Sequence, residues 1–339
     1  MTKQNTRYLF VLLGALGDVV RGMSLVDVLK AAQPGAHISW LVEPANEGVV
    51  RLHSGVDDVI VFERHLGLKG FIKVRNELKR RHFDITFDLQ RHLKSGAFSW
   101  LSGASIRVGF HPKDSKEGNW IFNNRFISRH GESISKVEHY RHFLRAIGIE
   151  GTESVTFGLD HHNLENIESD WKNDLSRPYV ALVLGSSWDS KDWPIEGYAG
   201  LLELLEGHQV VLLGDSSKME MGKSLRLESK RTRVLDLSGK TSLSELVALI
   251  QGAAACVGPD SGPGHIAGAV GTPHITLFGP TSPVRNTPSG SERLSITANV
   301  GCAPCKRRIC PGLGKICMRM IRPEAVFERL SPFLDGTVG

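Results

Sequence analysis

The feature that most restricts the fold of this chain is an alternation of short apolar runs with helical patterns. Runs of strand length recur in the first half ("RYLFVLLG", "HISWLVEP", "DDVIVFE", "FDITFDLQ" and "IRVGF"), and helical patterns such as 19–31 and 70–81 separate most of them. Buried strands that alternate with helices are typical of a parallel sheet covered on both faces. The first half therefore predicts an α/β domain.

The same alternation restarts after Pro178, with "YVALVLG", "HQVVLLGD", "TRVLDLSG", "AACVGPD", "HITLFGP" and "LSITAN". Between the halves, residues 160–178 are polar and lack an apolar stripe, which indicates a linker. We predict two Rossmann-like, doubly wound parallel-sheet domains, 1–165 and 175–321, that face a cleft, the default place for a ligand. A last helix at about 322–335 could cross back to pack on the first domain.

Length and composition agree with two soluble domains. The 339 residues exceed the roughly 250–300 at which single cores stop growing. No apolar run reaches the roughly 18 residues of a membrane span, and Gly14 and Asp18 interrupt the N-terminal run where a signal peptide would continue. The net charge of +5 is compatible with an anionic substrate or an anionic membrane surface. We expect a cytoplasmic protein without a nucleic-acid partner.

A polar, glycine-rich turn, "GPDSGPGH" (258–265), follows one strand of the second half and opens a helix. Free amides at a helix start attract anions, and Gly262 and Gly264 would let a diphosphate approach the backbone. Asp260 would cap the helix or accept hydrogen bonds from sugar hydroxyls, with Ser261 beside it. His265 would donate to a phosphate oxygen, or else be a surface histidine without a role.

Two further loops follow strands directly. In "LGSSWDSKDWP", Ser186 and Ser187 offer hydroxyls, and Lys191 offers a mobile charge that could follow a diphosphate, although a lone lysine is usually a surface residue. In "GALGDVV", Asp18 lies at a helix start, where an N-cap is the commonest explanation for an aspartate.

Together, "FVLLGALGDVVRGMSLVDVLK", "GSSWDSKDWP" and "GPDSGPGHIAGAVGTPHITLFGPTSP" resemble glycosyltransferase family 9, the ADP-heptose:lipopolysaccharide heptosyltransferases. The resemblance covers nearly the whole chain in the right order. It implies a GT-B fold with an N-terminal acceptor domain and a C-terminal donor domain.

The resemblance implies that Asp18 is the catalytic base. It also implies donor ligands in two groups, Ser186, Ser187 and Lys191 in one loop and Asp260, Ser261, Gly262, Gly264 and His265 in the other. Where the family has a glutamate for the nucleotide ribose, this chain has "LLGDSSKMEM", and Asp215 would take that place with a shorter reach.

The reading that follows is an inverting, metal-independent transfer of heptose from ADP-heptose to the anionic inner core of lipopolysaccharide, without a catalytic cofactor. Basic residues near Arg80 and from Arg91 to Lys94 would meet the acceptor, and the protein would work peripherally at the cytoplasmic face of the inner membrane. Two alternatives are a GT-B-like nucleotide-sugar epimerase and a non-catalytic nucleotide-sugar or glycan-binding module. The sequence leaves the exact sugar, the acceptor position and the oligomeric state open.

Four of the five cysteines, Cys302, Cys305, Cys310 and Cys317, fall within "CAPCKRRICPGLGKIC". In a cytoplasmic chain this clustering favours metal binding over disulfides, and four thiolates could form a closed structural zinc site. The irregular spacing leaves idle thiols equally open.

Overall fold

The computed structural model describes residues 5–150, 155–159, 164–176, 178–312 and 314–334. The chain separates into two compact units, 1–159 and 160–339. Parts of the linker expected at 160–178, namely 160–163 and 177, lie outside the described residues, as do 1–4, 151–154 and the end of the last expected helix at 335. The described part of the linker contains two short 3-10 helices, η3 (Leu164–Asn166) and η4 (Asp170–Asp174).

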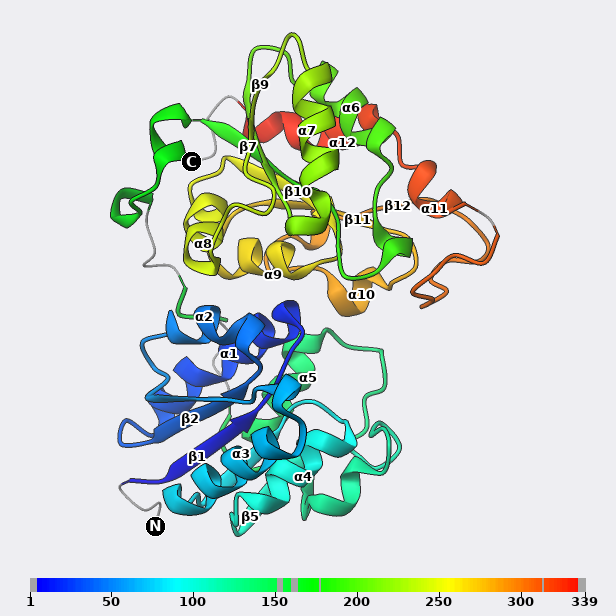
Figure 1. Cartoon of the computed structure of the whole chain (residues 1–339). Helices are drawn as coiled ribbons and strands as arrows, with labels where there is room; N and C mark the ends of the chain where they lie inside the picture. Colours follow the sequence, from blue (N-terminus) through cyan, green and yellow to red (C-terminus); the bar gives the residue numbers. More distant parts are fainter. Residues whose placement is uncertain (1–4, 151–154, 160–163, 177, 313, 335–339) are drawn as a thin grey trace. The chain divides into compact units, whose positions relative to one another are not determined.

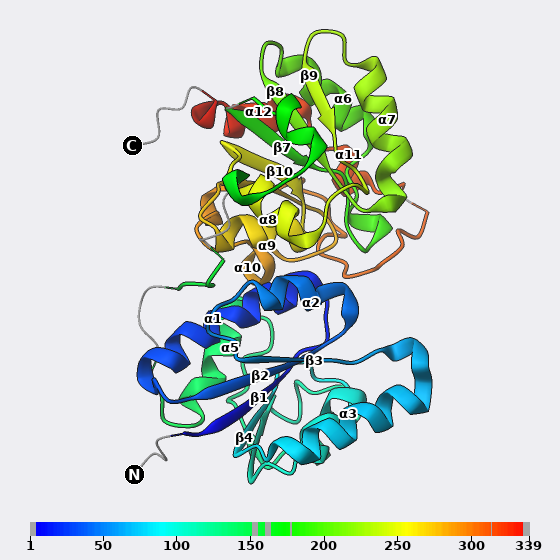
Figure 2. The same ribbon diagram turned by 60° about the vertical axis from the view of Figure 1, so that its left-hand side comes forward.

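The first unit is built on a six-stranded sheet with the order β3-β2-β1-β4-β5-β6, in which every neighbouring pair is parallel. Its strands are β1 (Arg7–Val11), β2 (His37–Val42), β3 (Asp58–Val61), β4 (Ile85–Asp88), β5 (Ile106–Gly109) and β6 (Arg125–Phe126). Its helices are α1 (Leu16–Ala32), α2 (Pro44–Arg51), α3 (Gly67–Arg81), α4 (Leu93–Leu101) and α5 (Lys136–Arg145). The helices α1, α2 and α5 cover one face of this sheet, and α3 and α4 cover the other (Figures 1 and 2).

The second unit repeats this plan with the strand order β12-β11-β10-β7-β8-β9, again parallel throughout. Its strands are β7 (Tyr179–Val183), β8 (Gln209–Leu213), β9 (Arg233–Asp236), β10 (Ala255–Pro259), β11 (His274–Phe278) and β12 (Ile296–Thr297). Its helices are α6 (Ile195–Leu204), α7 (Met219–Glu228), α8 (Leu243–Gln251), α9 (Gly262–Ala269), α10 (Pro283–Asn286), α11 (Ile316–Arg319) and α12 (Pro323–Leu330). The remaining 3-10 turns are η1 (Arg64–Leu66), η2 (Asn119–Phe122), η5 (Asp189–Lys191), η6 (Ser216–Lys218), η7 (Glu292–Leu294) and η8 (Ser331–Phe333).

Continuously apolar strands explain why both sheets are covered on two faces. All five residues of β7 and of β8 are buried, so each strand has apolar side chains on both sides of its sheet. In the first unit, the aromatic rings of Phe10, Trp40 and Phe87 pack within the core, with Phe10 centroids 5.4 Å from Trp40 and 5.2 Å from Phe87. This pattern confirms the predicted α/β class.

The last helix, α12, packs within the second unit. Val326, Leu330 and Leu334 are buried in the core of the second unit, and α12 packs against α6. The apolar side chains of α12 therefore belong to the second unit's core, and a contact of this helix with the first domain stays a prediction. Its single narrow apolar stripe could not reveal which of two similar cores it would join.

The topology selects the places where ligands bind. In each unit the order is 3-2-1-4-5-6, so the chain reverses its winding between the first and fourth strands, β1 and β4 in one unit and β7 and β10 in the other. In open α/β sheets, ligands bind outside the carboxyl ends of the strands at this point. Among the described residues, no helix is both long enough and apolar enough to cross a bilayer.

Candidate active site

The loop after β10 is shorter than the sequence indicated, because the strand continues to Pro259 and α9 begins at Gly262. Ser261 occupies the N-cap position with an extended backbone (φ −150°), and its side chain makes no capping hydrogen bond. The N-cap residue of α9 is therefore Ser261 rather than Asp260. The first-turn amides of α9 remain at the carboxyl end of β10, where the sequence placed the anion-binding turn.

Two hydroxyls at neighbouring strand ends are buried without a hydrogen-bond partner in the part of the chain that the structure describes. One is Ser261 Oγ, after β10, and the other is Thr281 Oγ1, three residues beyond β11. A buried hydroxyl without a partner is costly, and a ligand that accepts a hydrogen bond would remove the cost. Sequence reasoning missed Thr281, although "FGPTSP" follows a strand end in the same way.

His265 lies in the first turn of α9 with only 4% of its side chain exposed, and its Nε2 is 3.7 Å from Asp260 Oδ1. His274, the first residue of β11, is fully buried. A Cβ added at Gly264 of α9 would lie 2.9 Å from the His274 ring. Burial lowers the pKa of His274 to about 3, assisted by the charge of His265. Gly264 is thus required for the close packing of α9 on His274.

In the loop after β7, the backbone is organised by a buried carboxylate that the sequence reading did not single out. Asp192 accepts the amide N–H of Ser186 at 2.8 Å and the ammonium of Lys218 at 2.5 Å. Gly185 allows this turn with a φ of 134°, a conformation that favours glycine. The Ser186 hydroxyl is engaged locally with Trp188, and Ser187 is exposed.

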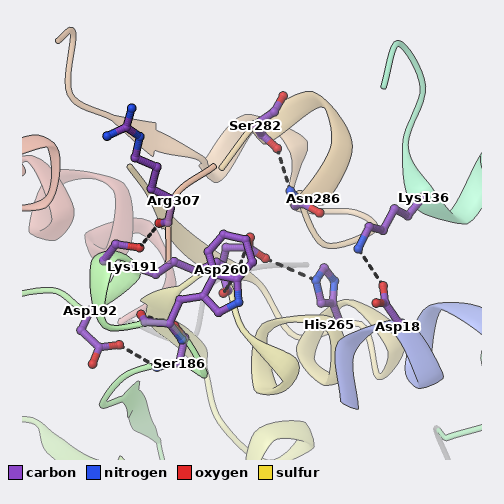
Figure 3. Close-up of polar contacts among 12 residues, drawn as sticks. Asp18, Lys136, Ser186, Lys191, Asp192, Asp260, His265, Ser282, Asn286 and Arg307 are labelled. Carbon is purple, nitrogen blue, oxygen red and sulfur yellow. Dashed lines mark hydrogen bonds and ion pairs between the residues drawn. The ribbon is translucent and has the colours of Figure 1, made fainter. Parts of the chain in front are cut away.

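Lys191 connects the two loops at the switch point of the second unit. Its Nζ donates to Asp260 at 3.0 Å (Oδ2) and 3.1 Å (backbone O), and it lies 4.6 Å from the centroid of Trp188 (Figure 3). Both partners are largely buried, with side-chain exposures of 12% and 7%. Lys191 is therefore held in place at the strand ends and is not an idle surface lysine.

Asp215, the residue expected at the nucleotide ribose, follows β8 and caps η6. Its Oδ1 accepts from the Ser217 amide at 2.8 Å and from the Ser217 hydroxyl at 2.6 Å, and the residue is exposed. Asp215 follows the carboxyl end of β8, at the same edge of the sheet as the loops after β7 and β10.

Asp18 lies in the first turn of α1, whose N-cap is Ala15, so it is not the N-cap. Its Oδ1 is 2.6 Å from Arg21 NH2 and 2.8 Å from Lys136 Nζ on α5, as Figure 3 shows for Lys136. Burial alone would raise the pKa of this carboxyl, but Lys136 and Arg21 outweigh it and hold the pKa well below its usual range. With 28% of its side chain exposed, Asp18 is an ionised carboxylate that solvent can reach.

The backbone before Asp18 is fixed by polar contacts from neighbouring elements. Gln90, just after β4, accepts from the Leu13 amide at 2.9 Å and donates to the Gly14 carbonyl at 3.1 Å. Asn46 donates to the Leu13 carbonyl at 3.2 Å. The loops after β1 and β4 are thereby joined at the switch point, and the start of α1 is held in position.

The two residues suggested for the acceptor have partners within the first unit. Lys94 forms an ion pair with Glu43 at 2.8 Å and lies 4.9 Å from the Phe62 centroid. Arg91 has a positive φ of 71° and lies 5.2 Å from the Phe110 centroid, with NH1 donating to the Asp114 carbonyl at 3.3 Å. Both lie after β4, at the same edge of the sheet as the start of α1.

The cysteine segment packs beside the loop that carries Lys191. Ser190 donates its hydroxyl to the Arg307 carbonyl at 2.6 Å, and Lys315 forms an ion pair with Asp189 at 2.8 Å. All five thiols are free, and burial raises the pKa of Cys317, with the thiols of Cys302, Cys305 and Cys310 raising it further. Across the described ranges, no three or more His, Cys, Asp or Glu side chains are grouped so that they could hold a metal ion. A shared ion would require these thiols to move closer together.

Two Rossmann-like parallel sheets, with polar loops at both switch points, define the GT-B class of glycosyltransferase folds. The chain belongs to glycosyltransferase family 9 (heptosyltransferase), whose family model matches residues 71–315. This confirms the resemblance seen in the sequence, and the protein is a glycosyltransferase.

Individual relatives agree over most of the chain. Lipopolysaccharide heptosyltransferase 2 of Escherichia coli (strain K12) is 35% identical over 336 residues, covering 94% of this chain and 96% of the relative. Lipopolysaccharide core heptosyltransferase OpsX of Haemophilus influenzae is 29% identical over 284 residues, covering 81% and 80%. The structure of E. coli heptosyltransferase WaaC with ADP has a TM-score of 0.77 at 23% identity, covering 97% of this chain and 100% of that one.

Proposed function

We propose that this protein transfers heptose from ADP-heptose to the inner core of lipopolysaccharide, with inversion at the anomeric carbon and without a metal. The family assignment and the relatives named above support the reaction class. Within the chain, the observation that supports the proposal most directly is the Lys191–Asp260 ion pair, which joins the loops after β7 and β10 at the switch point of the second unit.

The donor diphosphate would bind at the carboxyl ends of β7 and β10. The first-turn amides of α9 and the unpartnered Ser261 hydroxyl would donate hydrogen bonds to its oxygens, and Lys191 would turn from Asp260 to the phosphates. Asp260 would then accept hydrogen bonds from sugar hydroxyls. The solved WaaC structures with ADP and with ADP-2-deoxy-2-fluoro heptose support a donor of this kind.

Inversion requires a single in-line displacement. The acceptor hydroxyl oxygen forms a bond to the anomeric carbon, the bond from that carbon to the diphosphate oxygen breaks, and ADP leaves with the bonding electron pair. The hydroxyl proton passes to a base, for which we propose Asp18, since its carboxylate is ionised and reachable from solvent.

The negative charge that develops on the leaving diphosphate needs a cation or hydrogen-bond donors to stabilise it. Lys191, the α9 amides and the hydroxyls of Ser261 and Thr281 offer such partners from the chain itself. This set is the basis for proposing a metal-independent reaction, which activity retained in excess chelator would support.

The acceptor would be an anionic glycolipid, which a protein at the cytoplasmic face of the inner membrane can reach without crossing it. Arg91 and Lys94 stay proposed acceptor contacts, and Lys94 would have to exchange Glu43 for an acceptor anion.

A panel of nucleotide sugars tested with truncated lipopolysaccharide acceptors and read by mass spectrometry tests the proposal. We expect a mass gain of one heptose only with ADP-heptose and acceptor together. Nucleotide release without acceptor would indicate an epimerase, and donor binding without turnover in any combination would indicate a binding module.

A further inference from the structure

The helix α3 has one buried face and one exposed face that is both apolar and basic. Gly70, Val74 and Leu78 are buried, and Val74 and Leu78 belong to the core of the first unit. On the exposed side, Leu68 and Ile72 are 73% and 44% exposed. Large apolar side chains at such exposure, one helical turn apart, are not explained by packing within the unit.

Arg75 and Lys79 continue the line of Leu68 and Ile72 along the helix, because the four residues are spaced by four, three and four. Arg75 and Lys79 also line a surface hollow of about 490 Å³ together with Trp100 of α4, which is 59% exposed. We call these five residues the α3 strip. Figure 2 shows α3 along the outside of its unit, on the face of the sheet opposite α1 and α2.

The charge around the strip is strongly positive. Helix α3 carries six basic residues and one acid, Glu77. Lys73 pairs with Glu63, and Arg80 and Arg81 pair with Glu77. Among the described residues, Lys69, Arg75 and Lys79 form no ion pair with a carboxylate, so their charges are available to an anionic surface.

We infer that the α3 strip docks this protein on an anionic phospholipid leaflet. Leu68, Ile72 and Trp100 would enter the interfacial region, and the basic side chains would meet lipid phosphates. Clustered lysine and arginine beside exposed leucine and tryptophan favours a lipid surface over a protein partner, since charged residues are depleted at the core of protein interfaces. Only the role of this docking, which is to bring the enzyme to a glycolipid acceptor, rests on the proposed function.

Flotation of the full-length protein with vesicles tests the inference, using phosphatidylglycerol-containing vesicles against pure phosphatidylcholine. The triple variant Leu68→Asp, Arg75→Glu, Lys79→Glu should bind anionic vesicles at least about tenfold more weakly than wild type. The matched control is Leu227→Asp, Lys223→Glu, Arg226→Glu on α7, where Leu227 is 72% exposed and the charge change is the same. The control should bind as wild type does.

A second readout uses Trp100. Anionic vesicles should shift wild-type tryptophan emission to shorter wavelength, and Trp100→Phe should lose most of that shift while keeping its melting temperature. Failure of wild type to bind, equal binding to neutral vesicles, or equal loss in both triple variants would overturn the inference. Transfer to a soluble, delipidated acceptor is measured separately from vesicle binding, in wild type and in both triple variants. Absence of transfer in every protein would refute the proposed function and leave the docking result intact.

Discussion

The ammonium of Lys136 lies 2.8 Å from the carboxylate of Asp18, although 118 residues separate them in the chain. Together with Arg21 at 2.6 Å, Lys136 keeps Asp18 ionised against the effect of burial. A carboxylate so stabilised is always ready to accept a proton, but it is a weaker base than a free aspartate. Lys136 therefore sets the pH range over which the proposed base can act.

Replacing Lys136 by methionine should shift the acid limb of the kcat/KM profile to higher pH by about 1–3 pH units. The direction follows because the Asp18 pKa is lowered in the wild type, and loss of the cation lets burial raise it. Lys136→Arg should keep the wild-type profile. The same acid limb in Lys136→Met and wild type would show that Lys136 does not tune the base.

Lys191→Ala should weaken ADP binding and lower kcat/KM by about 10–1000-fold, because a charge on the diphosphate acts in both the ground state and the transition state. Calorimetry with ADP and steady-state kinetics measure the two effects. Lys223→Ala, an exposed lysine on α7, is the matched control and should change neither. Wild-type affinity and rate in Lys191→Ala would leave Lys191 as a partner of Asp260 alone.

Acidification should destabilise the second unit through His274. The pKa of His274 is lowered to about 3 in the folded protein, against about 6.5 when unfolded. Its contribution to the free energy of unfolding is therefore fully present above pH 6.5 and is lost as the pH falls toward 3. Between pH 7 and pH 4.5, the free energy of unfolding measured with denaturant should fall by about 1–3 kcal/mol less in His274→Gln than in wild type. His65→Gln, at an exposed position, is the control and should lose as much stability on acidification as wild type does. The same loss in His274→Gln as in wild type would contradict the prediction and would show that His274 is protonated in the folded protein.

The zinc site suggested by Cys302, Cys305, Cys310 and Cys317 stays a prediction. Elemental analysis of protein purified without chelator should find about one zinc per chain, and Cys305→Ser should remove it and lower the melting temperature. Cys256→Ser, at a buried thiol in β10, is the control for loss of an unrelated cysteine and should retain the metal. Metal-free protein with an unchanged melting temperature in Cys305→Ser would contradict the prediction, and the catalytic proposal is independent of the result.

The strands could be predicted because their apolar runs are local signals, and even β12 (Ile296–Thr297) lies within a run that the sequence indicated. The two-residue β6 could not, since Arg125 and Phe126 are both exposed and carry no apolar pattern. The candidate loops were found because glycine and polar residues follow strands. The contacts of their side chains could not be predicted, because the Lys136–Asp18 and Lys191–Asp260 pairs join segments that are distant in the sequence.

Helix caps illustrate the same limit. Aspartate is a strong N-cap, so propensity alone suggested that role for Asp18 and Asp260, yet the caps are Ala15 and Ser261. In both cases a lysine from a distant segment takes the carboxylate, and the tertiary ion pair overrides the local preference. Such pairs become visible only when the strands are assembled.

The most direct test of the central claim is the turnover of Asp18→Asn with ADP-heptose and a lipopolysaccharide acceptor. Asparagine keeps the size of the side chain but cannot accept the hydroxyl proton, so kcat should fall by about 10²–10⁴. Donor affinity and melting temperature should stay close to wild type, because the donor loops lie in the other unit's sheet. A near-normal kcat in a folded, donor-binding Asp18→Asn protein would contradict Asp18 as the base.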